Sequence, residues 1–172
     1  IVIEDNAVSL DPRVVRTDVR AFFDLVSAAQ EASDRGDDAE SLALARHAMH
    51  QFSGAFLPGD AGESWTVSLR ERLRARFVEL VDGIGRRLEA GSEWEEAAHW
   101  YRRGLEVDEP SEAFYQGLMR CHLAQGRHAE GVAVFGRMRE VLAAALGVAP
   151  SARSEALRGE LMRGSANSVM NR

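Results

Sequence analysis

Apolar residues recur at helical spacing along almost the whole chain after residue 17. Near the start of this region, Val19, Phe22, Phe23 and Val26 follow the i, i+3, i+4, i+7 rule that marks one face of an α-helix. Short stretches rich in Gly, Pro and polar residues interrupt the pattern. The sequence therefore predicts seven helices, at about 17–32, 38–52, 64–90, 92–107, 110–126, 127–146 and 151–162.

Residues suited to helix capping support these ranges. Thr17 or Asp18 fits the start of the first helix, and Ser151 follows a Gly-Val-Ala-Pro break at the start of the last. Ser92 and Glu95 have the Ser-x-x-Glu spacing of a capping box, which predicts the start of the fourth helix. The third helix carries an apolar stripe that begins at Trp65. Residues 164–172 lack apolar periodicity, so we expect a flexible tail there.

The first ten residues have a different pattern, in which apolar and polar positions alternate. Ile1 and Ile3 share one face, Val8 and Leu10 share one face, and Asp5-Asn6 between them suits a turn. This predicts a short β-hairpin. Because an isolated hairpin is marginal in water, it must lean on the helices or belong to a sheet with strands upstream of Ile1. The absence of an initial Met suggests a fragment of a longer protein.

Two helix pairs in the second half of the chain superimpose on each other at a fixed offset of 34 residues. Trp94, Ala97 and Tyr101 map onto His128, Gly131 and Phe135. In the preceding helices, Val81, Ile84 and Leu88 map onto Tyr115, Leu118 and His122. A helix–turn–helix unit of this period is the tetratricopeptide signature. The positions that we expect to build the repeat are Trp94, Ala97, Tyr101, Tyr115, Leu118, Gly126, Gly131 and Phe135.

The repeat pattern predicts how the helices pack. The small residues Ala97 and Gly131 let two helices approach closely, while Tyr101 and Phe135 fill the space between one pair and the next. Only residues 81–141 keep strict register, so we expect an irregular, capped array rather than an extended solenoid. The predicted fold class is all-α, a tetratricopeptide-like antiparallel array of about seven helices with a short N-terminal β-hairpin. Such repeats form surfaces for other molecules and rarely supply chemistry.

The composition limits the partners. All 21 basic residues are Arg, and the net charge of −6 opposes binding to phosphate backbones. Arg70, Arg72, Arg74 and Arg76 resemble a basic patch, but alternate residues project about 200° apart on a helix. We therefore interpret them as surface residues paired with neighbouring Glu, and expect no direct binding of nucleic acid. No apolar run is long enough for a membrane span. Without a signal peptide to contradict it, a cytoplasmic location is the default expectation.

Residues that could carry chemistry are few. The single Cys121 excludes an internal disulfide and suits a partly buried thiol. His47 and His50 have i, i+3 spacing, but no carboxylate or Cys completes a metal-binding set. The sequence has no Gly-rich phosphate loop, nucleophilic triad order or paired carboxylates in an apolar setting. We expect no catalytic residues, no metal and no cofactor.

One candidate binding surface follows from the repeat register. If Val81 and Tyr115 are equivalent, then the residues one and five positions after each are also equivalent. These residues project from the first helix of each pair toward the inner side of the array. These residues are Asp82, Arg86, Gln116 and Arg120. As a hypothesis, the two arginines bind carboxylates of a partner, since guanidinium groups pair bidentately with them. The alternative is that they pair locally, with Asp82 or with Glu89.

Longer stretches of the chain resemble a known family. These are VSLDPRVVRTDVRAFFDLV, FSGAFLPG followed by Trp65, RERLRARFVEL and, most specifically, EPSEAFYQGLMRCHLAQGRHAEGVAVFGRMREVLAAALGVAPS. Together they resemble the bacterial transcriptional activation domain of regulators of the Streptomyces antibiotic regulatory protein type. The resemblance covers about Val8 to Leu161. The chain departs from the family pattern at Gly131, where Ala is expected, and at Glu109, inserted between Asp and Pro.

The resemblance implies a helical regulatory domain that follows a winged helix-turn-helix DNA-binding domain. Residues 1–16 would be the end of that upstream domain, 17–163 the regulatory domain and 164–172 the tail. The implied partners are the upstream DNA-binding domain, a second copy of the chain or the transcription machinery. The alternative function is a free-standing tetratricopeptide adapter that binds a peptide or protein. Neither function requires an enzyme.

Overall fold

The computed structural model describes residues 2–4, 7–9, 15–52, 54, 59 and 63–170, with side chains for 15–52, 54, 59 and 63–165. The chain divides into two compact units, Ile1–Gly54 and Ala55–Arg172. Each unit is built by helices that pack on helices. Among the described residues, the first unit holds a helix pair and the second holds five helices.

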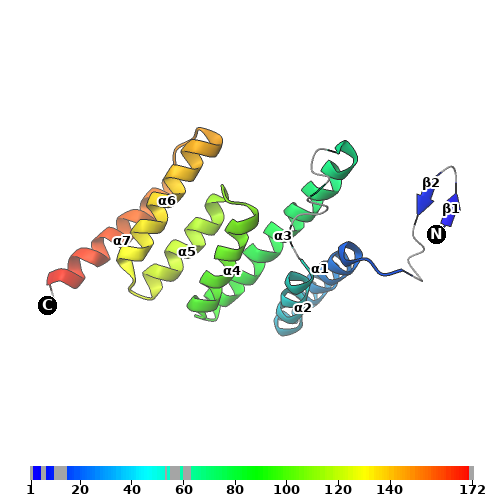
Figure 1. Ribbon diagram of the computed structural model, residues 1–172. Coiled ribbons are helices and arrows are strands. Elements are labelled where there is room, and N and C mark those ends of the chain that lie inside the picture. Colours follow the sequence, from blue (N-terminus) through cyan, green and yellow to red (C-terminus); the bar gives the residue numbers. More distant parts are fainter. Residues whose placement is uncertain are drawn as a thin grey trace. The chain divides into compact units, whose positions relative to one another are not determined.

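The first unit is formed by α1 (Asp18–Asp34) and α2 (Asp38–Gln51), which pack against each other (Figure 1). As predicted, Thr17 caps α1: its Oγ1 accepts a hydrogen bond of 3.2 Å from the N–H of Arg20. Ser41 is buried and donates from Oγ to the Ala29 carbonyl at 2.8 Å. This bond satisfies a buried hydroxyl and ties the two helices together. The buried apolar residues of the pair include Phe22, Ala29, Ala32, Ala45, Ala48 and Met49.

The predicted fold class is wrong in making a hairpin part of the fold. Two strands of three residues, β1 (Val2–Glu4) and β2 (Ala7–Ser9), pair antiparallel with Val2 opposite Ser9. In the described residues the packing within each unit is between helices, and the two strands pair with each other. Strands this short have few pairing hydrogen bonds and little apolar surface to bury. The flanking Ile1 and Leu10 lie outside the described residues.

The second unit is a row of helices in which each packs on the next (Figure 1). The helix α5 also packs on α3 and α7, its second neighbours in the row. The seventh helix ends at Met170 rather than near Met162, the predicted end. The members of the row are α3 (Ser64–Ala90), α4 (Trp94–Val107), α5 (Glu112–Ala124), α6 (His128–Leu146) and α7 (Ala152–Met170).

The 34-residue offset is present in the backbone. The turns between α3 and α4 and between α5 and α6 make the same backbone hydrogen bonds, shifted by the repeat length. The second residue of each turn has positive φ, 61° at Ser92 and 69° at Gly126. The turn between α1 and α2 has the same pattern, with Gly36 at 78°. One type of turn therefore closes each of these helix pairs.

The predicted capping box at the start of α4 is wrong. The N-cap of α4 is Glu93, and no side chain caps that helix end. Ser92 lies one residue earlier, in the left-handed conformation that closes the turn. Because Ser92 belongs to the turn, one residue before the N-cap, its hydroxyl does not cap α4. A second difference is Trp65, which lies in the first turn of α3 and is 64% exposed.

Small residues bring the helices of the second unit close together. A Cβ atom at Gly85 or at Gly117 would lie 2.4 Å from the ring of Tyr101, so α3 and α5 both contact this ring closely. Gly131, where the resemblance led us to expect Ala, makes room for Leu161: a Cβ there would lie 2.5 Å from the leucine side chain. The repeat positions Ala97, Tyr101, Tyr115, Leu118 and Phe135 are buried, Trp94 is half-buried and Gly126 is exposed in its turn.

Candidate functional site

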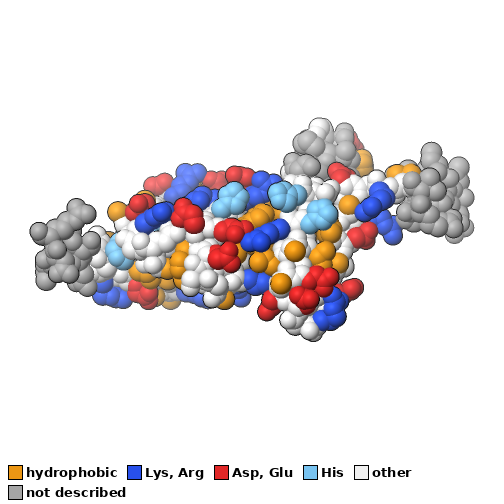
Figure 2. Space-filling view, turned by 90° about the horizontal axis from the view of Figure 1, so that it is seen from below, with side chains coloured by type: hydrophobic (Ala, Val, Ile, Leu, Met, Phe, Trp, Pro, Cys, Tyr) orange, Lys and Arg blue, Asp and Glu red, His pale blue; other side chains and the backbone are white. Residues whose placement is uncertain are grey.

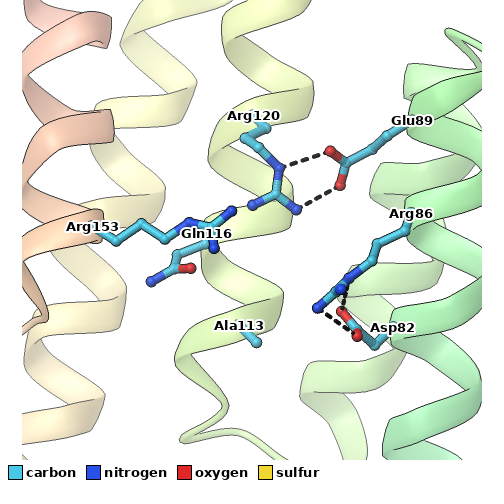
Figure 3. A pocket seen from close by; sticks show the side chains of 7 residues that line it. All are labelled: Asp82, Arg86, Glu89, Ala113, Gln116, Arg120 and Arg153. Carbon is cyan, nitrogen blue, oxygen red and sulfur yellow. Dashed lines mark hydrogen bonds and ion pairs between the residues drawn. The ribbon is translucent and has the colours of Figure 1, made fainter.

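The helices α3, α5 and α7 line a pocket of about 240 Å³ (Figure 3). The structure brings together the four residues that the repeat register placed on one side, and it adds three more. Residues three or four apart share a helix face, which explains why α3 and α5 each contribute a row of side chains. The lining residues are Asp82, Arg86, Glu89, Ala113, Gln116, Arg120 and Arg153.

Arg120 forms a two-pronged polar contact in the wall of the pocket. Its Nε and Nη2 donate to the two carboxylate oxygens of Glu89, each at 2.7 Å. The side chains of Arg120 and Glu89 are only 26% and 15% exposed. The hydrogen bond to Glu89 raises the pKa of the Arg120 guanidinium further, so this group stays charged.

Glu89 also accepts a hydrogen bond from the hydroxyl of Tyr101. Burial of Tyr101, followed by this bond to Glu89, raises the pKa of the phenol well above its usual range. The carboxylate of Glu89 therefore links a core tyrosine of α4 to an arginine of α5. These contacts make Arg120 and Glu89 part of the packing of the second unit as well as part of the pocket wall.

Arg86 pairs locally as well, but in a more exposed setting. Its Nε and Nη2 lie 3.1 Å and 2.9 Å from the carboxylate of Asp82, one turn away on α3. The two side chains are 70% and 31% exposed, so water screens the pair and it contributes little to stability. Both arginines singled out from the sequence thus have the local carboxylate partner that the alternative interpretation expected.

A polar cluster attaches α7 to α5 beside the pocket. Glu112 Oε1 accepts hydrogen bonds from Ser154 Oγ at 2.6 Å and from the N–H of Ser151 at 2.7 Å. Gln116 Nε2 donates to Ser154 Oγ at 2.9 Å. Ser154 is completely buried, so its hydroxyl depends on these partners. We call Glu112, Gln116, Ser151 and Ser154 the α7 latch.

The α7 latch depends on an ionised Glu112. Burial opposes ionisation of this carboxyl, but hydrogen bonds from Ser154 and Ser151 outweigh burial and hold its pKa below the usual 4.5. A depressed carboxyl pKa contributes stability that is fully present above the unfolded pKa and is lost as the pH falls through the folded pKa. The attachment of α7 should therefore weaken in acid.

We expect Glu112→Gln to lower the free energy of unfolding by about 1 kcal/mol at neutral pH, because hydrogen bonds to a charged acceptor are lost. As the pH falls below 4.5, the difference between wild type and variant should shrink. Urea unfolding at a series of pH values measures both effects. Glu160→Gln, which changes an exposed carboxylate of α7, should follow wild type. Identical curves for wild type and Glu112→Gln would show that the latch contributes nothing.

Arg153 is the pocket residue that sequence reasoning missed. It lies in the first turn of α7, in the Ser-Ala-Arg-Ser segment that also carries Ser151 and Ser154 of the latch. Extending the repeat offset beyond Arg120 leads to position 154, one residue from Arg153. The repeat therefore pointed to this part of α7, although the strict register ended before it.

A second, mainly apolar pocket of about 570 Å³ lies on the opposite side of α5. Its walls include Leu105, Leu118 and Val134. His122 also lines it, and its Nδ1 has no hydrogen-bond partner among the described residues. Burial, followed by the charge of Arg102, lowers the pKa of this imidazole, which favours its neutral form.

The remaining candidates from the sequence occupy ordinary environments. As predicted for a paired surface, Arg74 pairs with Glu71 at 3.5 Å and Arg76 pairs with Glu79 at 2.8 Å, each within α3. Arg74 also pairs with Asp108, just after α4, at 2.6 Å. Cys121 is buried, and burial raises the pKa of its thiol to about 12, which disfavours the reactive thiolate.

Charged side chains of both signs are mixed on the face shown in Figure 2, with apolar patches between them. Proteins that bind nucleic acid through their phosphates typically gather basic residues on one face or stripe. Among the residues that the structure describes, every helix is too short or too polar to cross a membrane.

Comparison with known proteins identifies the family of the chain. No curated protein matches the sequence. The family model of the bacterial transcriptional activator domain matches residues 17–162, which include the first helix pair and the pocket-lining residues of the second unit. The chain belongs to the bacterial transcriptional activator domain family.

Proposed function

We propose that the chain is the regulatory, protein-interaction domain of a bacterial transcription regulator of the Streptomyces antibiotic regulatory protein type. It acts on a winged helix-turn-helix domain that precedes it in the same polypeptide. The family match over residues 17–162 carries the proposal. The net charge of −6 supports a division of labour in which the upstream domain binds DNA and this domain binds protein.

The helix row of the second unit supplies the surface for this role. Its repeated turns and 34-residue period favour a tetratricopeptide-like array, an architecture that presents extended surfaces to partners. We propose that the partner contacts the pocket side of α3 and α5, at Asp82, Arg86, Gln116 and Arg120. Candidate partners are the upstream domain, a second copy of the chain and the transcription machinery. The domain carries out no chemistry itself and acts in the cytoplasm.

The gene sequence upstream of Ile1, together with a promoter–reporter assay, tests this function. We expect an encoded winged-helix segment immediately upstream. Deleting residues 17–162 from the intact regulator should leave DNA binding by the upstream segment in place but abolish activation of the reporter. Absence of an upstream DNA-binding segment would overturn the proposal in favour of the adapter. Full activation by the deletion variant would also overturn it.

A further inference from the structure

The pocket between α3, α5 and α7 carries three arginines against two carboxylates, in a chain whose net charge is −6. Arg86 and Arg120 are already paired, with Asp82 and Glu89 respectively. Arg153 makes no ion pair or hydrogen bond with any residue that the structure describes. In Figure 3 its side chain extends from α7 toward α5, over the pocket. Among the described residues, Arg153 is thus the cation of the pocket that has no partner.

Gln116 supplies an acceptor beside this cation. The hydroxyl proton of Ser154 is donated to Glu112, so the same hydroxyl oxygen must accept from Gln116. The Gln116 amide is therefore oriented with Nε2 toward Ser154, and its carbonyl oxygen accepts no hydrogen bond from the described residues. A free guanidinium and a free amide carbonyl lie together at the pocket.

We propose that this pocket binds an acidic peptide segment of a partner protein. A side-chain or C-terminal carboxylate of the segment pairs with Arg153, and an N–H group of the segment donates to Gln116 Oε1. Arg86, whose pair with Asp82 is exposed, adds attraction at the α3 side. The inference rests on the proposed protein-interaction function and names the chemistry of the partner.

The charges of the pocket favour a carboxylate over a phosphate or a nucleic acid. Asp82 and Glu89 are fixed in the same wall and would repel a doubly charged phosphate group. A single carboxylate is matched by the one excess arginine, and its planar oxygens fit a guanidinium bidentately. The volume of about 240 Å³ holds one or two side chains rather than a folded surface. A peptide also provides the N–H donor that Gln116 lacks.

Under this proposal Arg153, rather than Arg120, binds the carboxylate of the partner. Its donors are bound to Glu89, which also holds Tyr101, so Arg120 forms the wall of the pocket instead of gripping the partner. A test that removes Arg86 and Arg120 together would confuse lost binding with lost packing. Arg153 avoids this difficulty, because it is exposed and has no internal partner among the described residues.

Selection of peptides from a displayed library of random short sequences tests the proposal on the chain itself. We expect the selected peptides to be enriched in Asp, Glu or a free C-terminal carboxylate. Fluorescence anisotropy should show that Arg153→Glu weakens their binding by about tenfold or more, which corresponds to about 1.4 kcal/mol. Arg139→Glu, the same charge change at an exposed arginine of α6, should bind like wild type.

Three results would overturn the proposal: no enrichment of acidic peptides, equal binding by Arg153→Glu, or equal loss with Arg139→Glu. Thermal unfolding of both variants should match wild type, because neither arginine has an internal partner among the described residues. Arg153→Lys should bind with intermediate affinity, since it keeps the charge but not the planar donor pair. The selection uses no promoter, so its failure leaves the reporter result for the proposed function intact.

Discussion

Replacing Arg120 by Met is expected to lower the free energy of unfolding by about 2 to 3 kcal/mol. Removal of one member of a buried ion pair leaves the other charge without compensation, which typically costs about 3 to 5 kcal/mol. The lower value is appropriate here because Arg120 and Glu89 retain 26% and 15% exposure. Because Met preserves most of the aliphatic packing of Arg120, the decrease in the free energy of unfolding measures the effect of removing the charge. Equilibrium urea unfolding at neutral pH measures it.

Arg86→Met is the matched control, since Arg86 also pairs with a carboxylate of α3. Because that pair is largely exposed, we expect a change of no more than about 0.5 kcal/mol. Equal effects of the two substitutions would contradict the structural role of the Arg120–Glu89 pair.

A double variant separates charge from packing. Glu89→Gln in the Arg120→Met background removes the uncompensated carboxylate and leaves a neutral group that still accepts from Tyr101. We expect it to recover about 1 kcal/mol relative to Arg120→Met alone, because residues of one network are not additive. A double variant that is less stable than Arg120→Met would argue against an uncompensated charge as the cause.

The helices were predictable because their apolar positions recur at a fixed period. The sequence predicts the third helix at 64–90, and the structure has it at Ser64–Ala90. The sequence predicts the sixth at 127–146, and the structure has it at His128–Leu146. The 34-residue offset further indicated which residues are equivalent in successive pairs. Periodicity of this kind depends only on burial of one helix face, which the sequence records directly.

Local motifs were less reliable guides, because the conformation of such a motif also depends on the turn it lies in and on the residues that pack against it. The Ser-x-x-Glu pattern at Ser92 predicted a capping box, but the turn needs a left-handed residue there. The alternation at the N-terminus predicts a hairpin within the fold, yet in the described residues the two strands pair with each other and the packing of each unit is between helices. Trp65 continued the apolar stripe of α3 and is nonetheless 64% exposed. Pattern alone does not show which neighbours are present to cover a residue.

The candidate site was predictable only in part for the same reason. The repeat register placed Asp82, Arg86, Gln116 and Arg120 on one side, and all four line one pocket. The register could not show which of these charges are neutralised, since pairing of Arg120 with Glu89 depends on the distance between α5 and α3. Arg153 lies outside the strict register and is positioned by the α7 latch.

Replacing Gly117 by Ala is expected to lower the free energy of unfolding by about 2 kcal/mol, although Ala is the better helix former. A Cβ at Gly117 would lie 2.4 Å from the Tyr101 ring, and Gly85 contacts the other edge of the same ring just as closely. The ring therefore cannot move away, and its hydroxyl is bound to Glu89. Overpacking of this kind costs up to about 3 kcal/mol, against a propensity gain of about 1 kcal/mol.

Gly136→Ala is expected to raise the free energy of unfolding, the opposite of the effect of Gly117→Ala. This glycine of α6 has open space around its Cβ position, so Ala should stabilise the chain by up to about 1 kcal/mol. Urea unfolding of the two variants beside wild type should therefore give changes of opposite sign. Stabilisation by Gly117→Ala would show that α4 and α5 can separate around Tyr101 at little cost. The close approach of α3, α4 and α5, on which the pocket geometry depends, would then not require these glycines.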